Sequence, residues 1–103
     1  IKTSGYRVSQ SEVEDALMMT GAFSSVTVFG LPDDNLGQRL HAVATAHSDV
    51  PVDTRSVLKQ LSNILPSYMI PREIELLDEL PMTPNGKVNL RQLVEERKVA
   101  GDI

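Results

Sequence analysis

The sequence predicts an α+β domain in which helices pack on a small sheet of about three strands that follows an N-terminal β-hairpin. Three observations carry this prediction: short apolar or alternating runs typical of strands, stretches with helical apolar spacing, and capping residues or breakers between them. The chain has 103 residues, of which 41% are hydrophobic and 23% charged. This composition is ordinary for one globular domain over residues 1–103.

The chain opens with a bent strand or hairpin and a helix. IKTSGYRVS (residues 1–9) places β-branched and aromatic residues around Gly5. Ser9 and Glu12 have the spacing of a capping box, and Gly21 supplies a C-terminal stop. The residues expected to fill the core from this helix are Val13, Ala16, Leu17, Met18 and Met19.

Two strands should follow. FSSVTVFG (23–30) is typical of a buried strand, and RLHAVATA (39–46) alternates in polarity. LPDDNLGQ (31–38) is rich in turn formers, which predicts an extended hairpin loop. The residues expected on one side of the second strand are Leu40, Ala42, Ala44 and Ala46.

A second helix and a third strand complete the sheet. Asp53 can cap the helix and Pro66 would end it. Its expected apolar face is Val57, Leu58, Leu61, Ile64 and Leu65. Residues 72–78 (REIELLD) alternate as a strand. Its inward residues would be Ile74 and Leu76, and its outward residues Glu73 and Glu75.

A last helix is expected after residue 89. Asn89 and Gln92 have capping-box spacing, and Val88 can pack against Leu93 across the cap. The inner face of this helix would be Leu90, Leu93 and Val94.

Charge and composition exclude several function classes. The net charge of −4 disfavours non-specific binding to nucleic acid or to an anionic membrane surface. Without cysteine there is no disulfide, thiolate metal site or thiol nucleophile. No apolar run approaches the roughly 18 residues of a membrane span, and the start lacks a signal-peptide layout. We expect a cytoplasmic protein. The chain also opens in mid-pattern without an initiator Met, so we expect a piece of a longer protein.

The candidate chemical groups are ordinary when each is taken alone. Lys87, in LPMTPNGKVNLRQL (80–93), follows two prolines and an Asn-Gly step, but most such lysines are solvated surface charges. His41 and His47 have no acid or nucleophile at motif spacing, so strand packing or solvent exposure is expected for each. The acid pairs at 33–34 and 95–96 are expected to be solvated. We identify no metal site, catalytic triad or phosphate-binding glycine loop.

Two segments taken together change this interpretation. IKTSGYRVSQSEVE (1–14) resembles the hinge-proximal motif of the C-terminal domain of adenylate-forming (AMP-dependent) ligases, and LPMTPNGKVNLRQL resembles the last motif of that domain. VFGLPDDNLGQ and LPSYMIPREIELLDELP match the segments between them. The resemblance covers essentially the whole chain. GYRVSQSEVE looks more like acyl-CoA or acyl-carrier-protein synthetases than like peptide synthetases, which usually read GYRIELGEIE.

The resemblance implies a mobile catalytic lid. Lys87 would be the catalytic lysine of an ATP-dependent, AMP-forming acid–thiol ligase, which also uses Mg²⁺ and CoA or phosphopantetheine. Gly5, Tyr6 and Arg7 would meet the thiol tunnel or a phosphate, although Gly5 can equally be a strand bend and Tyr6 can be packing. ATP and Mg²⁺ would be held mainly by a large N-terminal domain absent from this chain. We therefore expect the chain alone to be inactive.

Other readings of the resemblance stay open. The favoured one is an acyl-CoA synthetase of fatty acid metabolism, whose partners are its own large domain, a carboxylic acid, and CoA or an acyl carrier protein. The lid of a non-ribosomal peptide synthetase adenylation domain is a close alternative. A catalytically inactive, free-standing interaction module of the same fold is the third.

Overall fold

The computed structural model describes residues 2–3, 6–33, 37–47 and 51–101. It confirms the α+β class and the N-terminal hairpin. The elements in chain order are β1 (Lys2–Thr3), β2 (Tyr6–Arg7), α1 (Gln10–Met19), β3 (Phe23–Asp33), β4 (Gly37–Ala46), α2 (Thr54–Leu61), the 3₁₀ helix η1 (Ser67–Met69), β5 (Glu73–Leu76) and α3 (Leu90–Gly101). Among them, no helix is long and apolar enough to cross a membrane.

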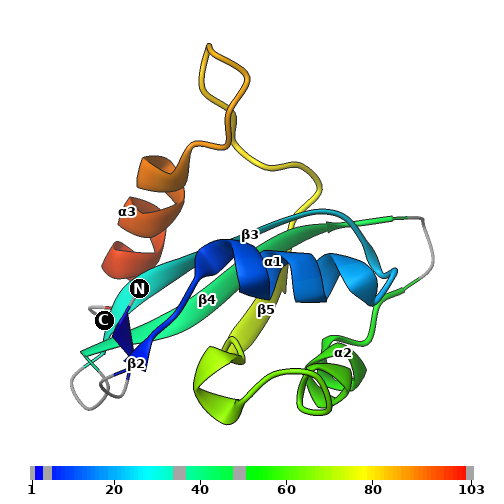
Figure 1. Ribbon diagram of the computed structural model, residues 1–103. Coiled ribbons are helices and arrows are strands. Elements are labelled where there is room, and N and C mark those ends of the chain that lie inside the picture. The colour runs from blue at the N-terminus through cyan, green and yellow to red at the C-terminus, as the bar shows by residue number, and fades with distance from the viewer. Residues whose placement is uncertain (1, 4–5, 34–36, 48–50, 102–103) are drawn as a thin grey trace.

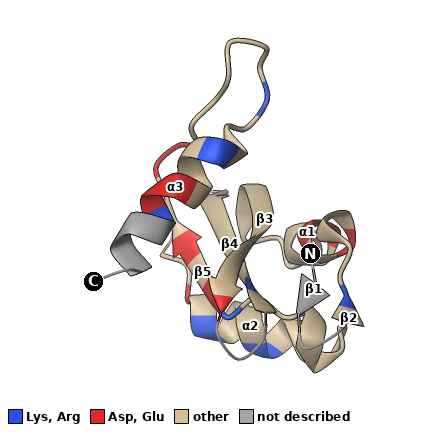
Figure 2. Ribbon diagram, turned by 90° about the vertical axis from the view of Figure 1, so that its left-hand side faces the viewer, with Lys and Arg blue, Asp and Glu red and all other residues tan. Residues whose placement is uncertain are grey.

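The central sheet is mixed and has the strand order β3-β4-β5. β3 and β4 are antiparallel, with Val28 opposite Ala42, whereas β4 and β5 are parallel, with Ala42 opposite Ile74. The parallel pair requires a crossover, which contains α2 and η1. α1 and α3 lie on different sides of this sheet (Figures 1 and 2).

The first core lies between the sheet and α1 and α2. Its buried members include Val13, Ala16 and Leu17 of α1, Val57 and Leu61 of α2, and Leu40, Ala42 and Ala44 of β4. These predicted inward positions are therefore confirmed. Ala46 was expected to join them but is exposed at the end of β4. Met18 and Met19 were also expected in the core, but they are 42% and 79% exposed because they lie on the outer side of the last turn of α1.

A second core covers the opposite face of the sheet. It comprises Phe29, Leu31, Val43, Leu80 and Leu93, with Leu77, Val88 and Val94 packed at its margin. Successive β4 residues point to opposite faces, so Ala42 belongs to the first core and Val43 to the second. β4 is therefore buried on both faces.

The predicted residues cap the helix starts, but the reciprocal bond of the capping box expected for Asn89 and Gln92 is absent, because the Asn89 N–H bonds Pro81. Ser9 Oγ accepts the Glu12 N–H at 3.4 Å, and Asn89 Oδ1 accepts the Gln92 N–H at 3.1 Å. Asp53 accepts the N–H groups at the start of α2, and hydrogen bonds from Ser56 lower the pKa of its carboxyl. The Asn89 N–H donates to the Pro81 carbonyl at 2.7 Å, so the loop before α3 supplies this bond.

The hairpin between β3 and β4 is tighter than predicted. The strands continue to Asp33 and resume at Gly37, so most of the expected loop at 31–38 is paired strand. Burial of Leu31, which is 2% exposed, favours continued pairing over the local turn propensity. Arg39 also donates from Nη1 to the Pro32 carbonyl at 2.6 Å. Residues 34–36 lie outside the described ranges.

α2 is shorter than its expected apolar face, although Leu58 and Leu65 do pack against the first core. The helix ends at Leu61, and Ile64 is 54% exposed. The Asn63 and Ile64 N–H groups bond the carbonyls three residues back, which tightens the chain and turns Ile64 away from the core. Pro66 precedes η1 and does not end α2.

Two other leucines also differ from the prediction. β5 spans Glu73–Leu76 and is shorter than residues 72–78. Ile74 is buried, but Leu76, at the end of the strand, is 40% exposed. Leu90 is likewise 40% exposed, whereas Leu93, the other expected leucine of α3, is buried.

The outer edge of β3 is covered by α1. Gln10 Nε2 donates to the Val28 carbonyl at 2.6 Å, and the Val28 N–H donates to Glu14 Oε2 at 2.8 Å. Gln10 and Glu14 are one helical turn apart, so both side chains reach the same strand residue. They occupy the backbone groups that a neighbouring strand would use.

Two residues of the expected α2 face, Leu61 and Ile64, should contribute differently to the stability of the domain. Leu61→Ala removes a fully buried side chain and should lower the free energy of unfolding by about 2–5 kcal/mol. Ile64→Ala removes an exposed one and should change it by about 0.5 kcal/mol or less. Urea unfolding of the 103-residue chain measures both, and equal losses would contradict this description of α2.

Candidate functional site

Lys87 lies on a short loop (residues 81–89, the Lys87 loop) that enters α3. Met82 and Val88 form an isolated antiparallel bridge at its base. The Thr83 N–H donates to the Lys87 carbonyl at 2.6 Å, and the Lys87 N–H donates to Thr83 Oγ1 at 3.2 Å. The backbone of Lys87 is therefore held on both its N–H and its carbonyl side.

A tight turn closes this loop. The Gly86 N–H donates to the Thr83 carbonyl at 2.9 Å, and Gly86 has a φ of 82°. Pro84 and Gly86 occupy the second and fourth turn positions, which favour these residue types. Glycine is favoured at residue 86 because most L-residues are strained at such a φ.

The base of the loop is anchored in the second core. Leu80 and Val88 pack there, and the Asn89 N–H bonds the Pro81 carbonyl. The tip stands away from the body of the domain (Figure 1). Lys87 itself is exposed. The loop thus presents an ammonium group on a braced backbone, where it can contact an anion outside this chain.

The other predicted site residues belong to the N-terminal hairpin, which lies apart from the Lys87 loop. Both ribbon views show this separation (Figures 1 and 2). Tyr6 stacks on Tyr68 of η1, with ring centroids 4.2 Å apart and planes 12° apart, yet it remains 55% exposed. Arg7 is exposed. Gly5 lies outside the described residues.

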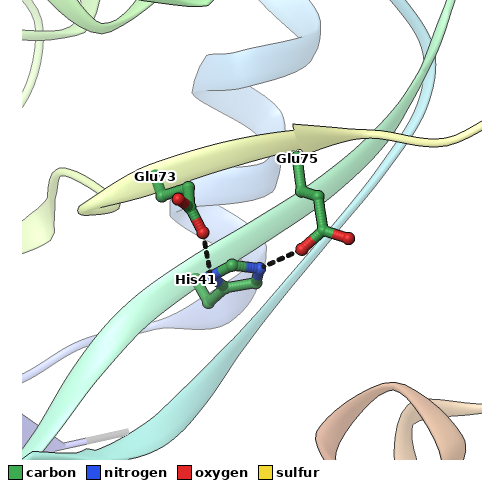
Figure 3. Close-up of side chains that lie close together, drawn as sticks. All are labelled: His41, Glu73 and Glu75. Atoms are coloured by element: carbon green, nitrogen blue, oxygen red, sulfur yellow. Dashed lines mark hydrogen bonds and ion pairs between the residues drawn. The ribbon is translucent and has the colours of Figure 1, made fainter. Parts of the chain in front are cut away.

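A charged cluster on the sheet was missed from the sequence. His41 is buried, and its two ring nitrogens face two carboxylates of β5 (Figure 3). His41 Nε2 lies 2.9 Å from Glu75 Oε1, and Nδ1 lies 3.5 Å from Glu73 Oε1. The alternation of glutamates predicted their shared face, but only the β4–β5 register places them opposite His41.

Arg97 of α3 completes this cluster. Its Nη2 lies 2.5 Å from Glu75 Oε2 and its Nε lies 3.1 Å from Glu75 Oε1, a two-pronged contact. Burial acts to raise the pKa of Glu75, but hydrogen bonds from Arg97 and His41 outweigh it and lower that pKa. Glu75 is therefore ionised at neutral pH.

The polar side chains of this cluster bind one another. His41, Glu73 and Glu75 have ligand atoms within 4.8 Å of one another, a spacing that could suit a metal ion. However, the Arg97 guanidinium already occupies both oxygens of Glu75, and the two carboxylates face different nitrogens of the ring. This arrangement favours an ion-pair network over a cation site.

Sequence comparisons identify the relatives of this chain. The profile described as AMP-binding enzyme C-terminal domain matches residues 12–87. Malonate–CoA ligase ACSF3, mitochondrial, from Bos taurus is 38% identical over 93% of this chain and 16% of its own length. Bacitracin synthase 3 from Bacillus licheniformis is 36% identical over 98% of this chain and 2% of its own length.

Solved structures agree with this assignment. Mycobacterium tuberculosis fatty acyl CoA synthetase matches with a TM-score of 0.87 and 25% identity, over 97% of this chain and 20% of that one. ATP-bound MatB from Rhodopseudomonas palustris matches with a TM-score of 0.90 and 26% identity, over 95% of this chain and 20% of that one. The chain thus spans a small part of each relative. It belongs to the family of AMP-binding enzyme C-terminal domains that adenylate-forming ligases carry.

Proposed function

We propose that this chain is the catalytic lid of an ATP-dependent, AMP-forming acyl ligase and that Lys87 acts in adenylation. The observation that carries this proposal is the braced Lys87 loop, whose backbone is held by Thr83 while its ammonium group is exposed. A fixed backbone reduces the conformational entropy that Lys87 would lose on contacting a reacting group.

The chemistry of adenylation requires such a cation. A carboxylate attacks the α-phosphate of ATP, the bond to the β-phosphate breaks and pyrophosphate leaves, so two anions meet and charge gathers on the non-bridging oxygens. A positioned ammonium group stabilises that charge, and loss of one such contact typically costs about 10²–10³-fold in rate. ATP and Mg²⁺ would be held mainly by a large domain outside this chain, which is why the chain alone should not adenylate.

The N-terminal hairpin would serve the second half-reaction. After adenylation the lid would turn, and Gly5, Tyr6 and Arg7 would face the thiol that accepts the acyl group. The separation of the hairpin from the Lys87 loop supports two successive poses. Stacking of Tyr6 on Tyr68 would fix the hairpin as it approaches the thiol, and Arg7 would meet a phosphate or help set the pose.

The acceptor and the acid define the finer alternatives. Relatives include a ligase named for malonate and CoA and a synthase named for bacitracin. CoA is the favoured acceptor here, and a carrier-protein thiol is the alternative, as for a peptide synthetase lid. A free-standing inactive module is the third possibility. A cytoplasmic location and a role in fatty acid metabolism stay predictions; one relative is named as mitochondrial.

Removing the Lys87 ammonium group should separate the two half-reactions. In the full-length enzyme, Lys87→Ala should slow adenylation by about 10²-fold or more, measured as acid-dependent ATP–pyrophosphate exchange. Transfer from a supplied acyl-adenylate to the thiol should persist. Lys59→Ala, at an exposed lysine of α2, is the matched control and should leave both rates unchanged. Normal adenylation by Lys87→Ala would refute the role.

The turn at Gly86 should matter for the same step. Gly86→Ala places a side chain at a φ of 82°, at a cost of about 1–2 kcal/mol. Adenylation should fall roughly five- to thirtyfold, and Gly86→Asn should lose less because asparagine tolerates this conformation. Gly21→Ala, at a φ of 77° after α1, bears similar strain far from the loop and should not slow exchange. A similar rate loss in Gly21→Ala would show that the effect is general.

The proposed role of Gly5 predicts that a substitution there impairs thiol transfer and spares adenylation, the reverse of the effect expected for Lys87→Ala. Gly5→Leu in the full-length enzyme should slow transfer from a supplied acyl-adenylate while leaving pyrophosphate exchange largely intact, because a side chain would obstruct close approach of the backbone to the thiol. Single-turnover assays of each half-reaction measure this. Equal loss in both would indicate that Gly5 serves only the bend of the hairpin.

A further inference from the structure

The charged cluster joins the helix that follows the Lys87 loop to the centre of the sheet. α3 begins at Leu90, three residues after Lys87. One helical turn beyond Leu93, Arg97 reaches β5 and holds both oxygens of Glu75. Its side chain is only 14% exposed. Arg97 Nη1 also donates to the Leu93 carbonyl at 3.2 Å, which ties the guanidinium to its own helix.

His41 fixes the acceptor side of this contact. Its Nε2 lies 2.9 Å from the Glu75 oxygen that Arg97 Nε also contacts. The ring packs against Phe29 at a centroid distance of 5.4 Å, and Glu73 lies at its other nitrogen. The Glu75 carboxylate is thus held by β4 as well as by α3.

Apolar packing alone would hold α3 less specifically. Leu93 is its fully buried contact with the second core, and such contacts tolerate small shifts. A two-pronged ion pair is directional and resists both sliding and rotation of the helix. Any shift of α3 would pass to the Lys87 loop through the capping bond of Asn89 and through its N–H bond to Pro81.

We propose that Arg97, Glu75 and His41 are positioning residues that set the pose of α3 and, through it, the place of Lys87 during adenylation. This inference rests on the proposed function of Lys87. The network does not touch the reacting groups. A displacement of about 1 Å at a reacting contact can cost roughly 10²-fold in rate, so a small movement of α3 is sufficient for a measurable effect.

The first test uses Arg97→Lys in the full-length enzyme. Lysine keeps the charge but cannot make the two-pronged contact. We expect pyrophosphate exchange to fall about tenfold in kcat, with KM for ATP and transfer from a supplied acyl-adenylate within about twofold. Arg55→Lys, at an exposed arginine of α2, is the matched control and should change none of these. Equal losses in both half-reactions would overturn the inference.

The double variant tests whether the network acts through Lys87. If it does, adding Arg97→Lys to Lys87→Ala should cause no further loss of exchange, because the group being positioned is gone. Independent, multiplying losses would overturn the inference. Glu75→Gln, which keeps the side-chain shape but removes the charge, should reproduce the Arg97→Lys pattern. If a thermal melt shows that Arg97→Lys is unfolded, the rates of Glu75→Gln test the inference in its place.

Hydrogen exchange separates this inference from the role of Lys87. In the full-length enzyme, backbone amide hydrogens of residues 82, 83 and 85–89 should exchange faster in Arg97→Lys than in the parent enzyme, and Arg55→Lys should leave their exchange rates unchanged. Unchanged hydrogen exchange of these amides in Arg97→Lys would overturn the inference. Faster hydrogen exchange in Arg97→Lys, together with normal adenylation by Lys87→Ala, would overturn the proposed function of Lys87. Positioning for adenylation would then fall as well, but the coupling of α3 to the Lys87 loop would stand.

Discussion

The double burial of β4 is the constraint on which the rest of the domain depends. β3 and β5 both pair with this strand, and both faces of the sheet are covered, so its alternating residues belong to two cores. Ala42 and Ala44 are small enough to admit α1 and α2 on one face, whereas Val43 contributes to the core under α3 on the other. The N-terminal hairpin and the Lys87 loop therefore rest on one shared framework.

This framework explains how a small domain can offer two different faces. The Lys87 loop is braced at its base by Leu80 and Val88 in the second core. The hairpin is tied instead to η1 through the stacking of Tyr6 and Tyr68. The two features are thus attached at different places on the same framework. In the proposed ligase, a turn of the domain would exchange an ammonium group for a thiol-binding segment.

Features that depend on neighbouring residues could be predicted from the sequence, but contacts that depend on the pairing of distant strands could not. Capping by Ser9, Asp53 and Asn89 follows from neighbouring residues, so these helix starts were predicted. Lys87 was singled out by the resemblance of its motif, since one loop lysine carries no signal alone. The contacts of His41 depend on the register between β4 and β5, which no local pattern specifies. Ile64 was misplaced because helical periodicity does not reveal where a helix ends in turns with bonds three residues back.

The covering of Val28 by Gln10 and Glu14 has a consequence for solubility. An outer strand with free amide and carbonyl groups is a template for intermolecular pairing and fibril growth. Here a foreign strand would first have to displace two side chains of α1 at the middle of β3. If the domain turns as proposed above, this cover of Val28 would move with it, because α1 belongs to the same domain. The same helix that fills the first core thereby blocks pairing at Val28 on this edge of the sheet.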